Sequence, residues 1–281
     1  MSSNLGAPPL DPQHLIADVL DVARRAGAEI LDVYRSRDRV QTAKADSSPL
    51  TLADLRSHRL IMRALGELTP RVPVLSEEGA VIAFAERATW RQHWLVDPLD
   101  GTKEFLSGNG EFTVNIALIG AHEAQFGVVY IPVLDTMYWG GPGLGAWRSK
   151  GAAEPIPIRV QRHAVAPVRV VGSRSHLGDS LEGFLSRLGP HEFVPFGSSL
   201  KFCMVAEGTA DVYPRLGPTS EWDTAAAHAI VAGAGGFVVT AAGEPLSYNA
   251  KADLRNPDFV VYADPDRDWL ALLGRPNSDR G

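Results

Sequence analysis

Apolar residues recur at helical spacing along most of the N-terminal quarter of the chain. They return every three or four residues over 15–34, which predicts an amphipathic helix. A second helix is expected over about 51–68. The run "VPVLSEEG" (72–79) predicts a short strand that ends in two glutamates and a glycine. The apolar start of "WLVDPLDGTKEF" (94–105) predicts a buried strand that ends directly in two aspartates.

Beyond this strand the apolar runs become short and are separated by turn residues. The runs 112–120, 126–132 and 135–140 predict an antiparallel meander. The proline-rich stretch 151–167 predicts the seam between two halves, because the strands that follow it alternate with helices. We therefore expect a layered α/β protein with two sheets, one in each half. The expected divisions are an N-terminal half over 13–150, a C-terminal half over 165–265, and flexible ends at 1–12 and 272–281.

Composition narrows the class of protein. With 281 residues, of which 45% are hydrophobic, the chain can bury a large core. Its net charge of −6 argues against a broad basic face that binds nucleic acid. No apolar run reaches the roughly 20 residues of a membrane span, so no integral membrane segment is expected. Cys203 is the single cysteine and lies in an apolar helical pattern, which predicts a buried, inert thiol and a reducing, cytoplasmic location.

Acidic residues gather at the ends of the predicted elements. They are Asp54, Glu77, Glu78, Asp97, Asp100 and Asp223. If these ends converge, like charges meet in one cleft, and burying them is costly unless they are paired or bind a metal ion. Ligands that are all oxygen atoms favour Mg²⁺. Each of these acids is also explained as a turn or helix-cap residue, so spacing alone leaves the metal site and local capping both open.

Longer motifs add a resemblance to a known family. The segments "LSEEG", "WLVDPLDGTKEF" and "EWDTAAAHAIVAGAGG" resemble the successive motifs of the inositol monophosphatase superfamily of Mg²⁺-dependent phosphatases. "GTKEFLSGNGEFTVNIALI" and "GSSLKFCMVAEGTADVYPRLGPTSEWDTAAAHAI" resemble more closely its CysQ-type 3'(2'),5'-bisphosphate nucleotidases, which hydrolyse 3'-phosphoadenosine 5'-phosphate (PAP) to AMP and phosphate. The resemblance implies a layered αβαβα sandwich of the inositol monophosphatase/fructose-1,6-bisphosphatase type, with helices between and outside two sheets.

The same resemblance implies roles for individual residues. The implied metal ligands, for two or three Mg²⁺ ions, are Glu77, Asp97, the backbone carbonyl of Leu99, Asp100 and Asp223. Thr102, paired with Asp54, would take the proton of the attacking water, and Glu77 would also be catalytic. The amides of Gly101 and Thr102 would receive the phosphate. No covalent phosphoenzyme is implied, inhibition by Li⁺ is expected, and Glu78 is not expected to be a ligand.

Two departures from the inositol-specific branch favour a nucleotide substrate. That branch usually carries an acidic residue seven positions before the aspartate of its "WD" motif, where this chain has Leu216. It also tends to read "GTTNF" where this chain reads "GTKEF". Lys103 and Arg215 are the first candidates to hold a second phosphate, with Lys201 and Arg174 behind them. The full set of expected substrate contacts is Glu77, Leu99, Asp100, Gly101, Thr102, Lys103, Ser198, Arg215 and Asp223.

Other polar residues near these motifs have simpler interpretations. Ser198 and Ser199 are expected first of all to cap the helix that follows them, with ligand contact as the alternative. His176 and His228 are expected to be structural, because nothing in the family's chemistry needs an imidazole.

Three functions remain in competition at this stage. The first is a PAP phosphatase of sulfur metabolism that also acts on 3'-phosphoadenosine 5'-phosphosulfate (PAPS) or discriminates against it. The second is an inositol 1-phosphate or sugar phosphatase. The third is a non-catalytic regulator that binds PAP or metal, which predicts a broken ligand set that this chain does not have. A homodimer and a loose, peripheral association with the inner membrane are left open.

Overall fold

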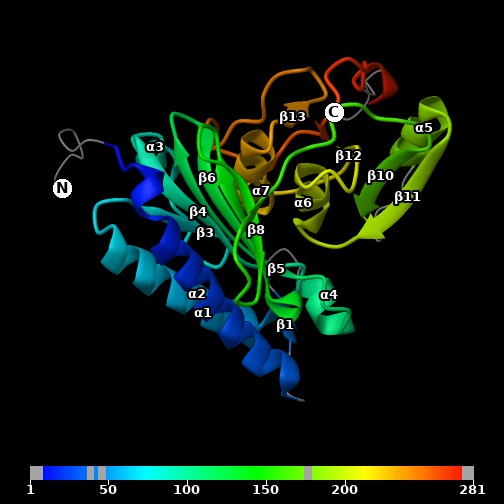
Figure 1. Cartoon of the computed structure of the whole chain (residues 1–281). Helices are drawn as coiled ribbons and strands as arrows, with labels where there is room; N and C mark the ends of the chain where they lie inside the picture. The colour runs from blue at the N-terminus through cyan, green and yellow to red at the C-terminus, as the bar shows by residue number, and fades with distance from the viewer. Residues whose placement is uncertain (1–8, 37–40, 44–48, 174–178, 274–281) are drawn as a thin grey trace.

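The computed structural model describes residues 9–36, 41–43, 49–173 and 179–273. Its elements form stacked layers of helices and sheets (Figure 1). Two residues singled out in the sequence, Arg174 and His176, lie outside the described residues, as does most of the two ends that were expected to be flexible. Within the described residues, no helix is long and apolar enough to cross a membrane.

Two long helices form the first layer. They are α1 (Ile16–Arg35) and α2 (Leu52–Leu68), and they pack against each other and against one face of the larger sheet (Figure 1). The apolar stripe of α1 is buried from Val19 to Val33, which confirms the predicted amphipathic helix. The helix α2 begins with a capping box, in which Thr51 and Asp54 exchange side-chain and backbone hydrogen bonds. This cap fixes the position of the Asp54 carboxylate.

The larger sheet has seven strands in the order β3-β4-β5-β6-β7-β8-β9. The strands are β3 (Val74–Ser76), β4 (Gln92–Asp100), β5 (Thr113–Gly120), β6 (Glu123–Ile131), β7 (Thr136–Gly141), β8 (Gly145–Lys150) and β9 (Ile156–Pro157). Among the described strands of this sheet, only β3 and β4 pair in parallel. The antiparallel pairing of β5, β6 and β7 confirms the predicted meander. Every residue of β5 is buried because helices cover both faces of the sheet.

Short elements join these strands and helices. They are η1 (Pro12–His14), β1 (Gln41–Ala43), β2 (Pro49–Thr51), α3 (Phe84–Arg87), α4 (Thr102–Ser107) and η2 (Pro132–Leu134). Of these, α4 matters most for function, because it starts directly after the end of β4.

The smaller sheet has five strands in the order β11-β10-β12-β14-β13. The strands are β10 (Val168–Ser173), β11 (His191–Phe196), β12 (Val212–Arg215), β13 (Phe237–Thr240) and β14 (Phe259–Tyr262). The helices α6 (Leu200–Ala206) and α7 (Glu221–Gly233) lie between the two sheets, whereas α5 (Asp179–Leu188) and η3 (Ala271–Leu273) lie on the outer side of the smaller one (Figure 1). The layers are therefore α, β, α, β, α, which confirms the expected sandwich.

The middle layer carries the shared core of the molecule. The alanine-rich helix α7 contacts β5, β6 and β7 on one side and β13 on the other. Its small side chains, such as Ala225 and Ala229, are fully buried and let the helix backbone approach the strands closely. The position of the α7 N-terminus is thus set by the larger sheet, although α7 lies between β12 and β13 of the smaller sheet in sequence.

Candidate metal and phosphate site

The site is built around the irregular end of β4. The pairing of β4 with β5 shifts register between Asp97 and Asp100, where Pro98 interrupts the strand. The hydroxyl of Ser57 donates to the Pro98 carbonyl at 2.8 Å, and the Leu99 amide donates to Asp97 Oδ1 at 3.0 Å. These bonds hold the turn, and Leu99 and the two aspartates line the same cavity of about 430 Å³.

Two further acids reach this cavity from other elements. Glu77 directly follows β3, whose parallel pairing with β4 brings the ends of both strands to the same edge. Asp223 lies in the first turn of α7, where its Oδ2 accepts a hydrogen bond from the Ser220 amide at 2.8 Å. Carboxylate oxygens of Glu77, Asp97 and Asp223 all lie within 4.8 Å of one another. The structure therefore brings together acids that are far apart in the sequence.

The negative charges of these acids act on one another. Burial, followed by the negative charges of Glu77, Asp100 and Asp223, raises the pKa of Asp97 well above its ordinary value. Burial and the neighbouring carboxylates of Asp100 and Glu77 also raise the pKa of Asp223, to about 8. A hard divalent cation would relieve this repulsion, and an all-oxygen donor set with a backbone carbonyl beside it suits Mg²⁺. The residues present fit such an ion.

The buried Asp54 forms a pair with Thr102, which lines the same cavity. Thr102 Oγ1 lies 3.3 Å from Asp54 Oδ1 and 3.5 Å from the Leu99 carbonyl oxygen. The other carboxylate oxygen of Asp54 accepts the Thr51 amide at 2.7 Å and the Thr51 hydroxyl at 2.6 Å. Asp54 thus caps α2 and contacts Thr102 at the same time, so the two interpretations of this residue are compatible.

A second, smaller cavity of about 140 Å³ shares several residues with the first, among them Asp100, Gly101, Lys103, Glu104 and Asp223. Of the two cavities, Ser198, Lys201 and Arg215 line only this one. Arg215 donates from Nη2 to the Pro218 carbonyl at 2.7 Å. Among the described residues, Arg215 Nε and Ser198 Oγ are buried atoms that have no hydrogen-bond partner. Two unpaired donors in one small cavity indicate a place for an anionic ligand.

Lys201 lines this cavity and binds the backbone beside it. It is only 5% exposed, and it donates to the carbonyls of Ser198 at 2.6 Å and Phe196 at 3.3 Å. Burial lowers the pKa of Lys201 to about 8, with Arg215 acting in the same direction and Asp100 opposing it. Its ammonium group holds the backbone around Ser198, a residue in the left-handed region at φ = 47°.

The expectation that Ser198 and Ser199 cap the following helix is wrong. Ser199 occupies the N-cap position of α6, but its side chain makes no cap hydrogen bond. Its amide and hydroxyl lie 2.6 and 2.8 Å from Asp100 Oδ2, and the hydroxyl lies 2.7 Å from the Asp223 carbonyl oxygen. A charged carboxylate is a stronger acceptor than a neutral group. The hydroxyl and amide of Ser199 therefore bind Asp100 and do not cap the helix.

Two polar residues of β5, which the sequence motifs did not single out, complete this arrangement. Asn115 donates from Nδ2 to Ser199 Oγ at 2.9 Å, and Thr113 donates to the Asn115 side-chain oxygen at 2.9 Å. Both side chains are fully buried. The signal was present in "FTVNIALIG", because an asparagine in an otherwise apolar strand must find buried partners.

Three other residues discussed above lie outside both cavities. His228 accepts or donates one hydrogen bond at Nδ1 with the Tyr248 hydroxyl, 2.8 Å away, and burial lowers its pKa to about 4. This fits the structural role expected for it. Cys203 is a buried free thiol, as predicted, and burial raises its pKa. Glu78 does not line either cavity.

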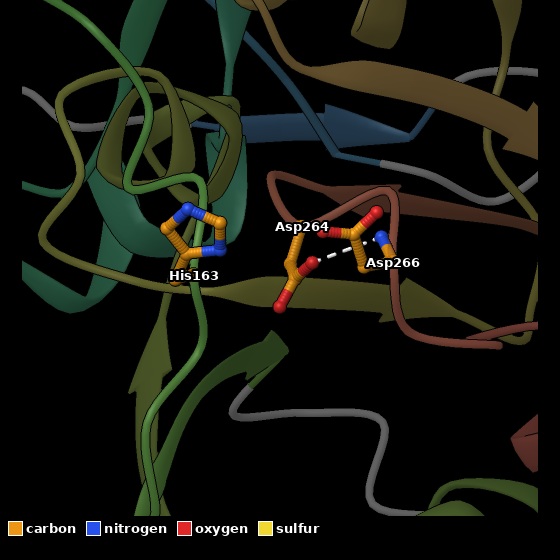
Figure 2. A group of neighbouring side chains, drawn as sticks. All are labelled: His163, Asp264 and Asp266. Carbon is orange, nitrogen blue, oxygen red and sulfur yellow. Dashed lines mark hydrogen bonds between the residues drawn. The ribbon is translucent and has the colours of Figure 1, made fainter.

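A second group of metal-ligating side chains occurs in the described residues, formed by His163, Asp264 and Asp266 (Figure 2). His163 and Asp266 are exposed, and Asp264 is buried. The two oxygens of Asp264 accept the backbone amides of Ala164 and Asp266, each at 3.0 Å. These backbone donors account for the burial of Asp264 without a cation.

The five-layered α/β fold and the acids that gather at the end of β4 are typical of metal-dependent phosphatases. The chain belongs to the inositol monophosphatase family, whose family model matches residues 11–268. This agrees with the resemblance seen in the motifs.

Individual relatives are similar over nearly the whole chain. The 3'(2'),5'-bisphosphate nucleotidase CysQ of Escherichia coli K12 is 48% identical over 249 residues, which cover 88% of this chain and 99% of that protein. CysQ of Buchnera aphidicola is 42% identical over 250 residues, covering 89% and 93%. The crystal structure of CysQ from Bacteroides thetaiotaomicron, at 44% identity, superposes with a TM-score of 0.80 and covers 89% of this chain and 97% of that one.

Proposed function

We propose that the chain is a Mg²⁺-dependent 3'(2'),5'-bisphosphate nucleotidase that removes the 3'-phosphate of PAP to give AMP and phosphate. PAPS is included as a further candidate substrate. The observation that carries the proposal is the joining of the carboxylate cavity to a second cavity lined by Lys103, Ser198 and Arg215. One cavity suits a phosphate that is cleaved, and the other suits a phosphate that is only bound. The names of the bisphosphate nucleotidases among its relatives support the same substrate.

The proposed metal ligands are the four acids around the end of β4 and one backbone carbonyl. They are Glu77, Asp97, Asp100, Asp223 and the carbonyl of Leu99, all of which line the larger cavity. Mg²⁺ held there would withdraw charge from the phosphoryl oxygens and from the leaving oxygen. Two or three ions remain the expected number. The scissile phosphate would lie against Gly101 and Thr102, which line the same cavity.

Asp54 and Thr102 are proposed to move the proton of the attacking water. The Thr102 hydroxyl donates to Asp54 Oδ1, and Thr102 also lines the cavity, where its oxygen can accept a proton from water. As the water oxygen bonds to phosphorus and the bond from phosphorus to the 3'-oxygen breaks, that proton passes through Thr102 towards the carboxylate. The released 3'-oxygen takes up a proton from solvent water and becomes a hydroxyl of AMP.

The second phosphate of PAP is proposed to bind between Ser198 and Arg215. Ser198 Oγ and Arg215 Nε both lack a partner among the described residues and both residues line the smaller cavity. A phosphate would satisfy both donors with charge-assisted hydrogen bonds. Lys103, which is exposed at the rim of both cavities, adds a positive charge. Leu216 supplies no carboxylate for the hydroxyl groups of a sugar ring, which disfavours an inositol phosphate.

Replacing Arg215 by methionine is expected to raise the KM for PAP by about 10- to 100-fold, as expected for a lost hydrogen bond to a charged group. The KM for 3'-AMP, which has no 5'-phosphate, should change by less than threefold. Steady-state kinetics with both substrates at saturating Mg²⁺ measures this difference. Equal increases for the two substrates would contradict the placement of the second phosphate and would indicate general damage to the site.

The experiment that tests the function compares phosphate release from PAP, PAPS and inositol 1-phosphate. We expect rapid release from PAP, weak release from inositol 1-phosphate, and loss of both after EDTA removes Mg²⁺, with recovery on its return. Strong turnover of inositol 1-phosphate and little of PAP would favour the sugar phosphatase. Binding of PAP without phosphate release would favour the non-catalytic regulator.

The location and assembly of the enzyme stay predictions. A cytoplasmic location agrees with Cys203 being a buried free thiol. The division into two halves, a homodimer and a peripheral association with the inner membrane remain expectations from the sequence.

A further inference from the structure

Ser199 contacts three elements around the proposed metal site, which are β4, β5 and α7. Its amide and hydroxyl reach Asp100 at the end of β4, and its hydroxyl also reaches the carbonyl of Asp223 in the first turn of α7. Asn115 of β5 donates to the same hydroxyl. Ser199 is only 2% exposed, so these contacts are shielded from water.

The contacts to Asp100 select one of its two oxygens. Within the described residues, every polar contact to this carboxylate ends at Oδ2 and comes from Thr113, Asn115 or Ser199. Ser199 makes the short hydrogen bonds, at 2.6 and 2.8 Å, whereas Asn115 Nδ2 and the Thr113 hydroxyl, whose hydrogen bonds Asn115, are both 3.4 Å away. Oδ1 therefore keeps its lone pairs for another partner in the cavity that Asp100 lines.

The hydroxyl of Ser199 also has a defined direction. It accepts a hydrogen bond from Asn115 Nδ2 at 2.9 Å, and so its single hydrogen is left to point towards Asp100 Oδ2 or the Asp223 carbonyl. Asn115 is itself held by Thr113, which donates to its side-chain oxygen. A chain of buried donors thus runs from β5 through Ser199 to both ligand-bearing elements.

We infer that Ser199 is a positioning residue for the metal site, which orients Asp100 for Mg²⁺ and ties it to the N-terminus of α7. This inference rests on the proposed function, because it assumes that Asp100 and Asp223 bind the ion. Groups that orient metal ligands in this way typically change metal affinity or activity 10- to 100-fold when they are removed. A merely structural serine would change stability and leave the affinity for Mg²⁺ unaltered.

The test is calorimetric titration of the full chain with MgCl₂ in the absence of substrate. We expect Ser199→Ala to raise the Kd for Mg²⁺ by about tenfold or more, and to reduce the increase in unfolding temperature that Mg²⁺ gives the wild type. Ser149→Ala is the matched control, because Ser149 is also a buried serine but lies in β8 and lines neither cavity. Its Kd should equal that of the wild type.

A second variant keeps the inference testable if Ser199→Ala does not fold. Asn115→Ala retains the serine but removes the donor that directs its hydroxyl, together with the longer contact of 3.4 Å to Asp100 Oδ2, so it should weaken Mg²⁺ binding in the same direction. A Kd within twofold of the wild type in both variants, or an equal increase in Ser149→Ala, would overturn the role of Ser199. If the wild type itself bound no Mg²⁺, the proposed function would fail instead.

Discussion

Replacing Asp100 by asparagine should reduce turnover of PAP by more than about 1,000-fold, which corresponds to about 4 kcal/mol of transition-state stabilisation. The amide oxygen of asparagine can still accept the hydrogen bonds that now end at Oδ2 of Asp100. The amide nitrogen then takes the place of Oδ1 and presents hydrogen atoms, in place of lone pairs, to the cation. The variant should therefore keep the fold and lose the metal site.

The stability of the same variant should change in the opposite direction. Asp100 contributes to the raised pKa of both Asp97 and Asp223, so removing its charge relieves repulsion among buried carboxylates. Without Mg²⁺, the unfolding temperature of Asp100→Asn should equal or exceed that of the wild type. Asp21→Asn, on the exposed face of α1, is the control and should change neither quantity. Full activity of Asp100→Asn with Mg²⁺ present would show that the metal scheme is wrong.

The parts of the site that follow from local sequence were predictable. The end of β4 is a strong local pattern, since an apolar strand leads into aspartates, a proline and a glycine. The same holds for Asp223, which forms a capping box with Ser220 in the first turn of an alanine-rich helix. In both cases the conformation of a few neighbouring residues fixes where the side chain lies. The layered fold followed for a similar reason, because the hydrophobic period changes clearly from strand to helix in the second half.

The parts that depend on long-range contacts were not predictable from pattern alone. Ser199 precedes a helix, and local rules therefore favour a cap, but its amide and hydroxyl bind Asp100, which is 99 positions away. The buried position of Lys201 could not be foreseen either, because lysines in amphipathic helices usually face solvent. The sequence shows which groups are polar, whereas the packing of α6 against two other elements decides which partner each of them finds.

The tight contact between the middle helix and the larger sheet should be equally sensitive to change. A Cβ atom at Gly127 in β6 would lie 2.0 Å from the backbone carbonyl oxygen of Ala226 in α7, a distance that no rotamer change can relieve. Gly127→Ala must therefore push α7 away from the strand. We expect a loss of about 3 kcal/mol in the free energy of unfolding, at the upper end for overpacked cores. That loss should lower the unfolding temperature by about 6–12 °C.

The displacement should also reach the metal site, because the first turn of α7 carries Asp223. The surviving folded Gly127→Ala protein should bind Mg²⁺ more weakly than the wild type when both are titrated well below their unfolding temperatures. Gly66→Ala is the matched control: Gly66 lies exposed in α2, and a methyl group there would have no atom within 4 Å, so alanine should stabilise the protein by about 0.5–1 kcal/mol. An unchanged unfolding temperature in Gly127→Ala would mean that α7 is not held against β6 as closely as the structure places it.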